Sequence, residues 1–373
     1  VALQELKDVM HKKRAFIVTD KFLYTNGNAN PIIEKLKEMN MEYTVFFDVE
    51  PDPTLACAKR GAEQMKSFQP DCIIALGGGS AMDAAKIMWV LYEHPEVDFL
   101  DMAMRFMDIR KRIYTFPKMG EKAYFIAVPT SAGTGSEVTP FAVITDETTG
   151  VKYPLADFEI TPDVAIVDPE LAETMPVKLV AHTGMDAMTH AIEAYVSTAN
   201  CNYTDPLAIW AIKMIQKHLV KSYNEDMESR DQMHDAQCLA GMSFSNALLG
   251  IVHSMAHKTG AAFKNGHIIH GAANAMYLPK VIKYNSKDET AKKRYGEIAD
   301  YMGLGGNSDD EKVDLLIKYL RQMNDDLNIP HCIKNYGEGG LPADEGIVPE
   351  DEFLEKLHDI AANAILDACT GSN

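Results

Sequence analysis

The sequence contains no long apolar run, no closely paired cysteines and no surplus of basic residues, and each absence excludes a class of protein. No apolar run approaches the ~18 residues that a transmembrane helix requires, and the first residues lack the apolar core of a signal peptide. The six cysteines form no C-x-x-C pair, which argues against zinc ribbons and against a secreted disulfide framework. These observations predict a cytoplasmic protein with no membrane partner.

Acidic residues outnumber basic ones by 54 to 36, which gives a formal net charge of -18. Such a surface repels phosphate backbones, so we expect no nucleic-acid partner. One dinucleotide can still bind where loop amides and a helix N-terminus face it. The chain of 373 residues is longer than one compact domain usually is, which predicts two domains, and its hydrophobic content of 46% is ordinary for a globular protein.

The first part of the chain alternates short apolar runs with amphipathic stretches, which predicts parallel strands joined by helices and covered on both faces. The expected strands are residues 15–19, 43–47, 72–76, 124–128 and 164–167. After Asp168 the strand pattern gives way to helical periodicity. We therefore predict an α/β domain over residues 1–168, followed by a helical domain over residues 169–373.

The predicted strand 72–76 runs directly into a glycine-rich turn and then into a helix. Gly78, Gly79 and Ser80 lie in this turn, where small residues let the backbone approach a pyrophosphate and the helix N-terminus offers free N–H groups. Asp83, in the first turn of the helix, is placed either to cap amides or to meet a ribose or nicotinamide group. A plain tight turn is the alternative, because the motif is not the G-x-G-x-x-G fingerprint.

Two further features indicate a nicotinamide dinucleotide. Residues 129–136 (PTSAGTGS) follow a predicted strand and supply many hydrogen-bond donors with little bulk, although a flexible linker has a similar composition. Asp48 ends the strand 43–47. A carboxylate there accepts from a ribose hydroxyl and repels a 2′-phosphate, which favours NAD over NADP unless the residue only serves a surface turn.

The second domain concentrates histidines at helical spacing. Seven of the 12 histidines lie within residues 190–270, and two pairs of potential metal ligands are spaced four residues apart, so that the members of each pair share one helix face. Buried core histidines are the alternative. Three imidazoles and one carboxylate suit Fe(II) or Zn(II) and leave room for an alcohol oxygen, whose carbon then releases hydride to a nicotinamide. The residues are Asp186 with His190, His253 with His257, and then His267 and His270.

The motifs GGGSAMDAAK, PTSAGTGSEVT, GMDAMTHAIEAY and HSMAHKTG…HGAANA together resemble the iron-containing alcohol dehydrogenase family over essentially the whole chain. Two segments, IMWVLYEHPE and residues 103–123, look like the alcohol dehydrogenase half of bifunctional aldehyde–alcohol dehydrogenases from fermenting organisms. This resemblance implies a dehydroquinate-synthase-like fold, with a Rossmann-type domain before a helical one. It further implies an enzyme that interconverts a short-chain aldehyde such as acetaldehyde and its primary alcohol, ethanol, in fermentation. The implied partners are further copies, in a homo-oligomer or filament, and a covalently linked aldehyde dehydrogenase half.

The same resemblance implies roles for individual residues. It assigns the metal to Asp186, His190 and His253, and it makes His257 the proton relay, so that His257, His253 and Asp186 carry the chemistry. The residues that it places around NAD, beyond Asp48, are Gly78, Gly79, Ser80, Asp83, Thr130, Ser131, Thr134 and Lys152.

Two histidines are candidates for the fourth metal ligand. The family's spacing of fourteen residues after the third ligand gives His267, whereas its H-G-x-x-N context gives His270. We favour His270, because a His-Gly pair that opens a helix is a geometric constraint and loop length is not; the loop KNGHII then carries an insertion.

Two other functions remain as alternatives. A diol or glycerol dehydrogenase would have the same metal and cofactor residues and would differ in pocket walls such as Phe141 and Phe244. A structural module for filament assembly would not need the ligand and glycine motifs. A phosphotransferase is disfavoured, because the glycine-rich turn has no Walker lysine pattern.

Overall fold

The computed structural model describes residues 2–103, 115–148, 151–260, 262–264, 266–337 and 347–372. Residues 104–114, part of the segment used for the resemblance to bifunctional enzymes, lie outside that description. The chain forms two compact units. Unit 1 comprises Val1–Thr130 and Ser136–Leu171, and unit 2 comprises Ser131–Gly135 and Ala172–Asn373. That the chain functions as two domains divided at residue 168 stays a prediction.

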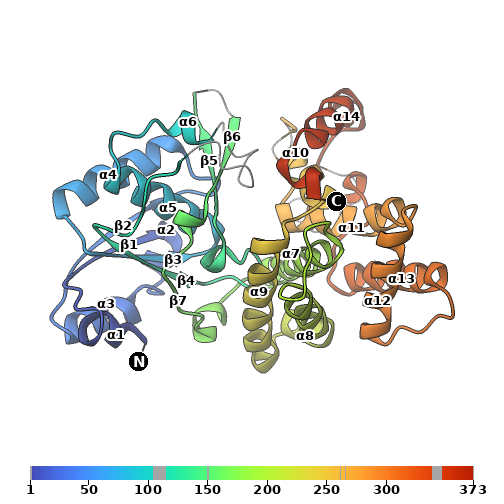
Figure 1. Cartoon of the computed structure of the whole chain (residues 1–373), viewed down its shortest axis with the longest axis horizontal. Helices are drawn as coiled ribbons and strands as arrows, with labels where there is room; N and C mark the ends of the chain where they lie inside the picture. The colour runs from blue at the N-terminus through green and yellow to red at the C-terminus, as the bar shows by residue number, and fades with distance from the viewer. Residues whose placement is uncertain are drawn as a thin grey trace. The chain divides into compact units, whose positions relative to one another are not determined.

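Unit 1 is built on a five-stranded sheet in the order β2-β1-β3-β4-β7, and every neighbouring pair is parallel (Figure 1). The predicted parallel α/β fold is therefore confirmed. The strands are β1 (Arg14–Asp20), β2 (Glu42–Val49), β3 (Cys72–Gly77), β4 (Tyr124–Pro129) and β7 (Val164–Ala165).

Alternate side chains of these strands enter two separate cores, which explains why the strands read as continuous apolar runs. Phe16 and Ile73 pack with helices α4 and α5, while Ile17 and Ile74 pack with α1 and α3 on the opposite face. The helices are α1 (Ala2–Asp8), α2 (Lys21–Thr25), α3 (Asn30–Glu38), α4 (Leu55–Phe68), α5 (Gly79–Glu93) and α6 (Phe99–Ala103).

Unit 1 also contains an antiparallel hairpin of β5 (Phe141–Asp146) and β6 (Val151–Ala156), which the sequence analysis did not predict. Pro154 lies inside β6, and proline within a run argues against a strand when only the sequence is read. A single bridge between Thr54 and Thr145 links the hairpin to the loop before α4.

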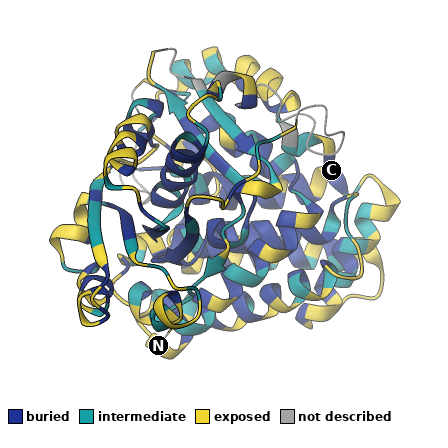
Figure 2. Ribbon diagram, turned by 60° about the vertical axis from the view of Figure 1, so that its left-hand side comes forward, coloured by how far each residue is buried: buried dark blue, intermediate teal, exposed yellow. Residues whose placement is uncertain are grey.

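Unit 2 is built of helices, as predicted. Its helix α7 is buried over most of its length, and it packs against α8, α9 and α11 (buried residues are dark blue in Figure 2). The helices are α7 (Val177–Val196), α8 (Asp205–Tyr223), α9 (Met227–Ala247), α10 (Ile251–Thr259), α11 (His270–Asn285), α12 (Glu289–Met302), α13 (Asp309–Asp326) and α14 (Glu350–Ile365).

Helices α9 and α10 follow each other with a bend of 105°. Leu248 has a φ of 65°, and Gly250 caps the start of α10. Within the described ranges, no single helix is long and apolar enough to cross a bilayer; α9 and α10 meet that criterion only as a bent pair.

Candidate metal and active site

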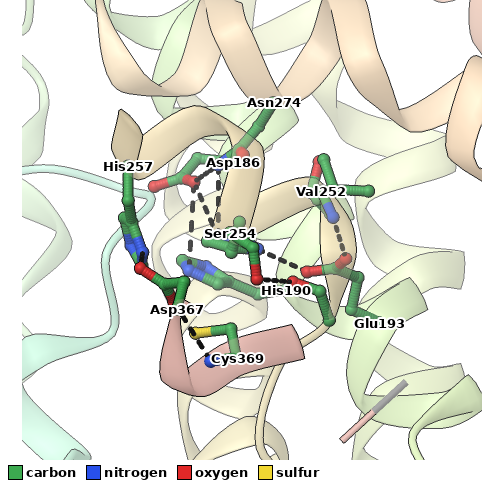
Figure 3. Close-up of polar contacts among 12 residues, drawn as sticks. Asp186, His190, Glu193, Val252, Ser254, His257, Asn274, Asp367 and Cys369 are labelled. Atoms are coloured by element: carbon green, nitrogen blue, oxygen red, sulfur yellow. Dashed lines mark hydrogen bonds and ion pairs between the residues drawn. The ribbon is translucent and has the colours of Figure 1, made fainter. Parts of the chain in front are cut away.

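Asp186 and His190 lie one turn apart on α7, so they face the same direction, as their spacing predicts. Both residues are 4% exposed, and Asp186 Oδ1 lies 3.9 Å from His190 Nε2 (Figure 3). Because α7 packs into the core of unit 2, both polar side chains are shielded from solvent.

Two more helices bring imidazoles to the same carboxylate. His253 Nε2, from α10, lies 3.5 Å from Asp186 Oδ1, and His270 Nε2, from α11, lies 3.6 Å from it. Asn274 donates its amide to Asp186 Oδ1 at 2.7 Å and lies one turn after His270. The ligand atoms of Asp186, His190 and His253 all lie within 4.8 Å of one another, a spacing suited to one metal ion.

The outer nitrogens of two rings are occupied by protein acceptors. His253 Nδ1 lies 2.6 Å from Glu193 Oε2, and His190 Nδ1 lies 3.1 Å from the carbonyl oxygen of Gly133. With Nδ1 donating outward, each ring directs Nε2 toward Asp186, as metal-binding histidines usually do. The residues therefore fit a divalent cation that accepts nitrogen and oxygen ligands.

The charges of this cluster also favour a cation. Burial opposes the ionised form of Asp186, but the neighbouring imidazoles outweigh it and lower the pKa of this carboxyl well below its usual range. Burial lowers the pKa of His190 to about 4, so this ring is neutral and can donate a lone pair. Burial also tends to lower the pKa of His253, but Asp186 and Glu193 outweigh it and raise that pKa to about 9. Two buried carboxylates thus stabilise positive charge at this position.

Sequence reasoning missed the outer contacts. Glu193 also accepts from the backbone N–H of Val252 at 2.7 Å, so one buried carboxylate fixes both the start of α10 and a ring on it. Gly133 is close to Thr183, and a Cβ atom on Gly133 would lie 2.5 Å from the Thr183 Cβ. The spacing of Glu193, seven residues after Asp186 on the same helix, was the available signal for its position.

In unit 1, the predicted glycine-rich turn lies between β3 and α5. Gly77 has a φ of 153°, and a Cβ there would lie 2.6 Å from the Ala81 Cβ, so the position requires glycine. Gly78 caps the 15-residue helix α5 without a side-chain hydrogen bond, while Gly79 and Ser80 form its first turn. The N–H groups at this helix start can therefore bind an anion such as a pyrophosphate.

Both the sequence and the fold of this chain are similar to those of known proteins. Residues 1–169 match the family described as iron-containing alcohol dehydrogenase, and residues 180–373 match the C-terminal part of the same family. The chain is 52% identical to an NADPH-dependent butanol dehydrogenase of Clostridium saccharobutylicum, over its full length and 90% of that protein. The chain belongs to the iron-containing alcohol dehydrogenase family. It is therefore an enzyme of the oxidoreductase class, as predicted.

Two other members of the family show how widely it is distributed. The chain is 49% identical to a bifunctional aldehyde-alcohol dehydrogenase of Escherichia coli, matching all of this chain but only 42% of that protein's length. An iron-containing alcohol dehydrogenase of Thermococcus thioreducens has the same fold, with a TM-score of 0.87 at 32% identity, covering 99% of this chain and 90% of that one.

In the structure of this alcohol dehydrogenase, the two candidates for the fourth ligand have different surroundings. His270 is the first residue of α11 and faces Asp186, whereas His267 is exposed in the preceding loop and comes near Gly260. Gly271 shows why glycine follows His270: a Cβ there would lie 2.1 Å from the carbonyl oxygen of His182 on α7. The His-Gly pair does open a helix that packs closely on the ligand helix. The metal-binding role of His270 remains a proposal.

The predicted proton relay, His257, lies one turn after His253 on α10. Its ring is stacked with that of His270, with centroids 5.3 Å apart. Phe244, predicted as a pocket wall, stacks on the ring of His190 at 4.3 Å. Sequence reasoning missed Asp367, whose Oδ2 lies 3.4 Å from His257 Nδ1, because 110 residues separate the two.

Asp83 is engaged by protein groups in unit 1. It accepts from Ser136 Oγ at 3.1 Å and from the N–H of Val143 at 3.0 Å. Nearby Lys86, which sequence reasoning missed, is fully buried and donates to the carbonyls of Ser136, Thr139 and Phe141. Burial raises the pKa of Asp83 to about 6 and lowers that of Lys86 to about 8, although each opposes the other's shift. The contact of Asp83 with a cofactor stays a prediction.

The other predicted cofactor residues are distributed over both units. Asp48 is exposed near the end of β2, and Lys152 on β6 forms an ion pair with Asp52 at 2.7 Å. Thr130, which donates its N–H to the Gly77 carbonyl, ends the first segment of unit 1. Ser131 and Thr134 belong to the short segment assigned to unit 2. Their contacts with NAD stay predictions.

Proposed function

We propose that this iron-containing alcohol dehydrogenase interconverts a short-chain aldehyde and its primary alcohol, acetaldehyde and ethanol first among them, with NADH and NAD. The observation that carries the proposal is that the imidazoles of His190, His253 and the partly exposed His270 meet around one oxygen of the buried Asp186 carboxylate. Four such donors suit Fe(II), and Zn(II) is the second candidate.

The chain's own residues then have distinct roles. Asp186 and the three imidazoles bind the ion, and Glu193 and Gly133 orient two of those rings through their Nδ1 atoms. A metal ion held by these residues would act as a Lewis acid toward the oxygen of the alcohol or aldehyde. His257 holds or accepts the proton that this oxygen loses, because its ring is next to His270 and its side chain is 34% exposed.

For the cofactor, we propose that the start of α5, with Gly78, Gly79 and Ser80, binds the pyrophosphate. Thr130, Ser131, Thr134 and Lys152 are proposed to contribute further contacts, and Asp83 to support the turn or the nicotinamide ribose. Asp48 at the end of β2 is the reason to propose NAD over NADP, because its carboxylate would repel a 2′-phosphate. The butanol dehydrogenase relative is named as NADPH-dependent, so the cofactor must be tested.

The relatives leave the length of the alcohol open, since one acts on butanol by name. They also leave the assembly open. The chain spans 42% of the bifunctional relative, so a linked aldehyde dehydrogenase half, a homo-oligomer or filament, and a cytoplasmic location are all proposals.

The deciding experiment measures metal-dependent aldehyde reduction. The protein is prepared anaerobically, stripped with a chelator and assayed before and after Fe(II) or Zn(II), with acetaldehyde and butyraldehyde, and with NADH and NADPH. We expect activity to disappear on stripping and to return with metal. Activity that is indifferent to the chelator would refute the metal site, and full metal occupancy without turnover on any alcohol or aldehyde would refute the function.

Three variants identify the fourth ligand. His253→Ala and His270→Ala should lose bound metal and activity together, because each removes a nitrogen that faces Asp186. His267→Ala is the matched control, since this exposed histidine lies only three residues before His270, in the loop that precedes α11. The assignment of His270 would be wrong if His270→Ala kept its metal while His267→Ala lost it.

A further inference from the structure

The short segment 367–372, which follows α14, lies against α10. Asp367 accepts from the N–H of Cys369 at 3.1 Å, which forms a local turn, and the segment continues as the 3-10 helix Ala368–Ser372. Thr370 Oγ1 lies 2.7 Å from Ser254 Oγ on α10, and the carbonyl of Ser372 accepts from the N–H of Thr198 at 2.9 Å. These contacts fix the segment at both ends.

The side chain that this turn presents to α10 is a carboxylate. Asp367 Oδ2 lies 3.4 Å from His257 Nδ1 and 2.9 Å from Lys258 Nζ, and the Asp367 side chain is only 9% exposed (Figure 3). Burial disfavours its charge, but His257 and Lys258 lower the pKa of Asp367 well below its usual range. A buried, ionised acceptor therefore faces one nitrogen of the predicted proton relay.

This group is not suited to a second metal ion. The ammonium of Lys258 already neutralises the Asp367 oxygen that faces His257. His257, Asp367 and Cys369 lie close enough to be considered as ligands, but burial raises the pKa of the half-buried Cys369 thiol, and a protonated thiol binds metal poorly. The contact between Asp367 and His257 is instead the arrangement of a carboxylate that orients an imidazole.

We propose that Asp367 is a positioning residue that holds His257 with Nδ1–H toward the 367–372 turn and Nε2 free for the proton of the alcohol. The inference rests on the proposed function, in which His257 relays that proton. A carboxylate that accepts from Nδ1–H fixes the tautomer and the orientation of the imidazole ring. Asp367 does not itself touch the reacting atoms.

The test compares Asp367→Asn with Asp359→Asn, a matched change on an exposed position of α14. Both proteins are loaded with metal, and kcat, KM, metal content, NADH affinity and melting temperature are measured. We expect Asp367→Asn to lower kcat by roughly 10- to 100-fold, with metal content and NADH affinity unchanged, and Asp359→Asn to match the parent enzyme. An unchanged kcat in Asp367→Asn would overturn the proposal.

Coupling between the two residues is the sharper readout. In a His257→Asn background, Asp367→Asn should lower kcat no further, because the ring that it positions is absent. An equal loss in both backgrounds would show a merely structural role and would overturn the proposal.

A measurement without turnover separates this inference from the proposed function. In 15N-histidine-labelled, Zn(II)-loaded protein, the spectrum should show His257 as the Nδ1–H tautomer, and Asp367→Asn should change it to a mixture. An unchanged tautomer would overturn the role of Asp367 even if the enzyme is active. An inactive parent enzyme with this tautomer change would instead refute the function and leave the positioning contact supported.

Discussion

Replacing Glu193 with glutamine should weaken metal binding without touching a ligand. The carboxylate is 5% exposed and accepts two hydrogen bonds, one from Val252 N–H at 2.7 Å and one from His253 Nδ1 at 2.6 Å. Glutamine has a single acceptor oxygen, so one of these two donors must face an NH2 group instead. The change therefore disturbs either the start of α10 or the ring that α10 carries.

The expected magnitude follows from these contacts. Loss of the outer partner of a metal-binding histidine costs about 10- to 100-fold in metal affinity, which is about 1.4 to 2.7 kcal/mol. The unpaired buried donor lowers the free energy of unfolding by a further ~1 to 3 kcal/mol.

The assay is an anaerobic titration of the stripped protein with Fe(II) or Zn(II) against a competing chelator, together with urea unfolding of the metal-free protein. Glu297→Gln is the control, because Glu297 accepts a hydrogen bond from Tyr195 and not from a candidate metal ligand. If Glu193→Gln bound metal within twofold of the parent, the orienting role argued for this carboxylate would be refuted.

Three further substitutions test other parts of the structure. Gly271→Ala should lower the free energy of unfolding by about 1 to 3 kcal/mol through overpacking, because its Cβ would lie 2.1 Å from the His182 carbonyl oxygen. Metal affinity should fall as well. Unchanged urea unfolding would contradict this prediction. The folded pKa of Asp83, about 6, lies above its ordinary 3.8, so its stabilising contribution is present below pH 3.8 and is lost as the pH rises through 6. Urea unfolding between pH 4 and 7 should therefore show a pH-dependent difference of at most about 3 kcal/mol between the parent and Asp83→Asn, and a difference that does not change with pH would exclude the shifted pKa. Asp48→Asn should increase kcat/KM for NADPH relative to NADH, and an unchanged ratio would remove this residue from cofactor selection.

The strands and helices were largely predictable because each depends on local pattern. Continuous apolar runs such as Cys72–Gly77 indicate strands buried on both faces, and all five strands of the parallel sheet were found in this way. The β5–β6 hairpin was missed because Pro154 and the polar residues around it conceal the strand signal. The pairing of its two strands and the bridge from Thr145 to Thr54 join the hairpin to unit 1, and neither contact is visible in a local window of the sequence.

In the candidate site, too, one part could be predicted from local spacing and another part could not. The pair Asp186 and His190 could be placed on one face, because a four-residue spacing on a helix leaves no other arrangement. The meeting of α7 with the histidines of α10 and α11 could only be inferred from the resemblance to a family, because spacing within each helix says nothing about how helices pack.

The sequence by itself determined the five strands of the parallel sheet, the helical character of the second half, the glycine-rich turn before α5 and the residue types available to bind a metal. Only the tertiary structure decided that His270 faces Asp186 while His267 stays exposed, and that Glu193 and Asp367 contact the rings of His253 and His257. The physical reason is that helical periodicity constrains residues three or four apart, whereas contacts across 60 or 110 residues depend on how whole helices pack.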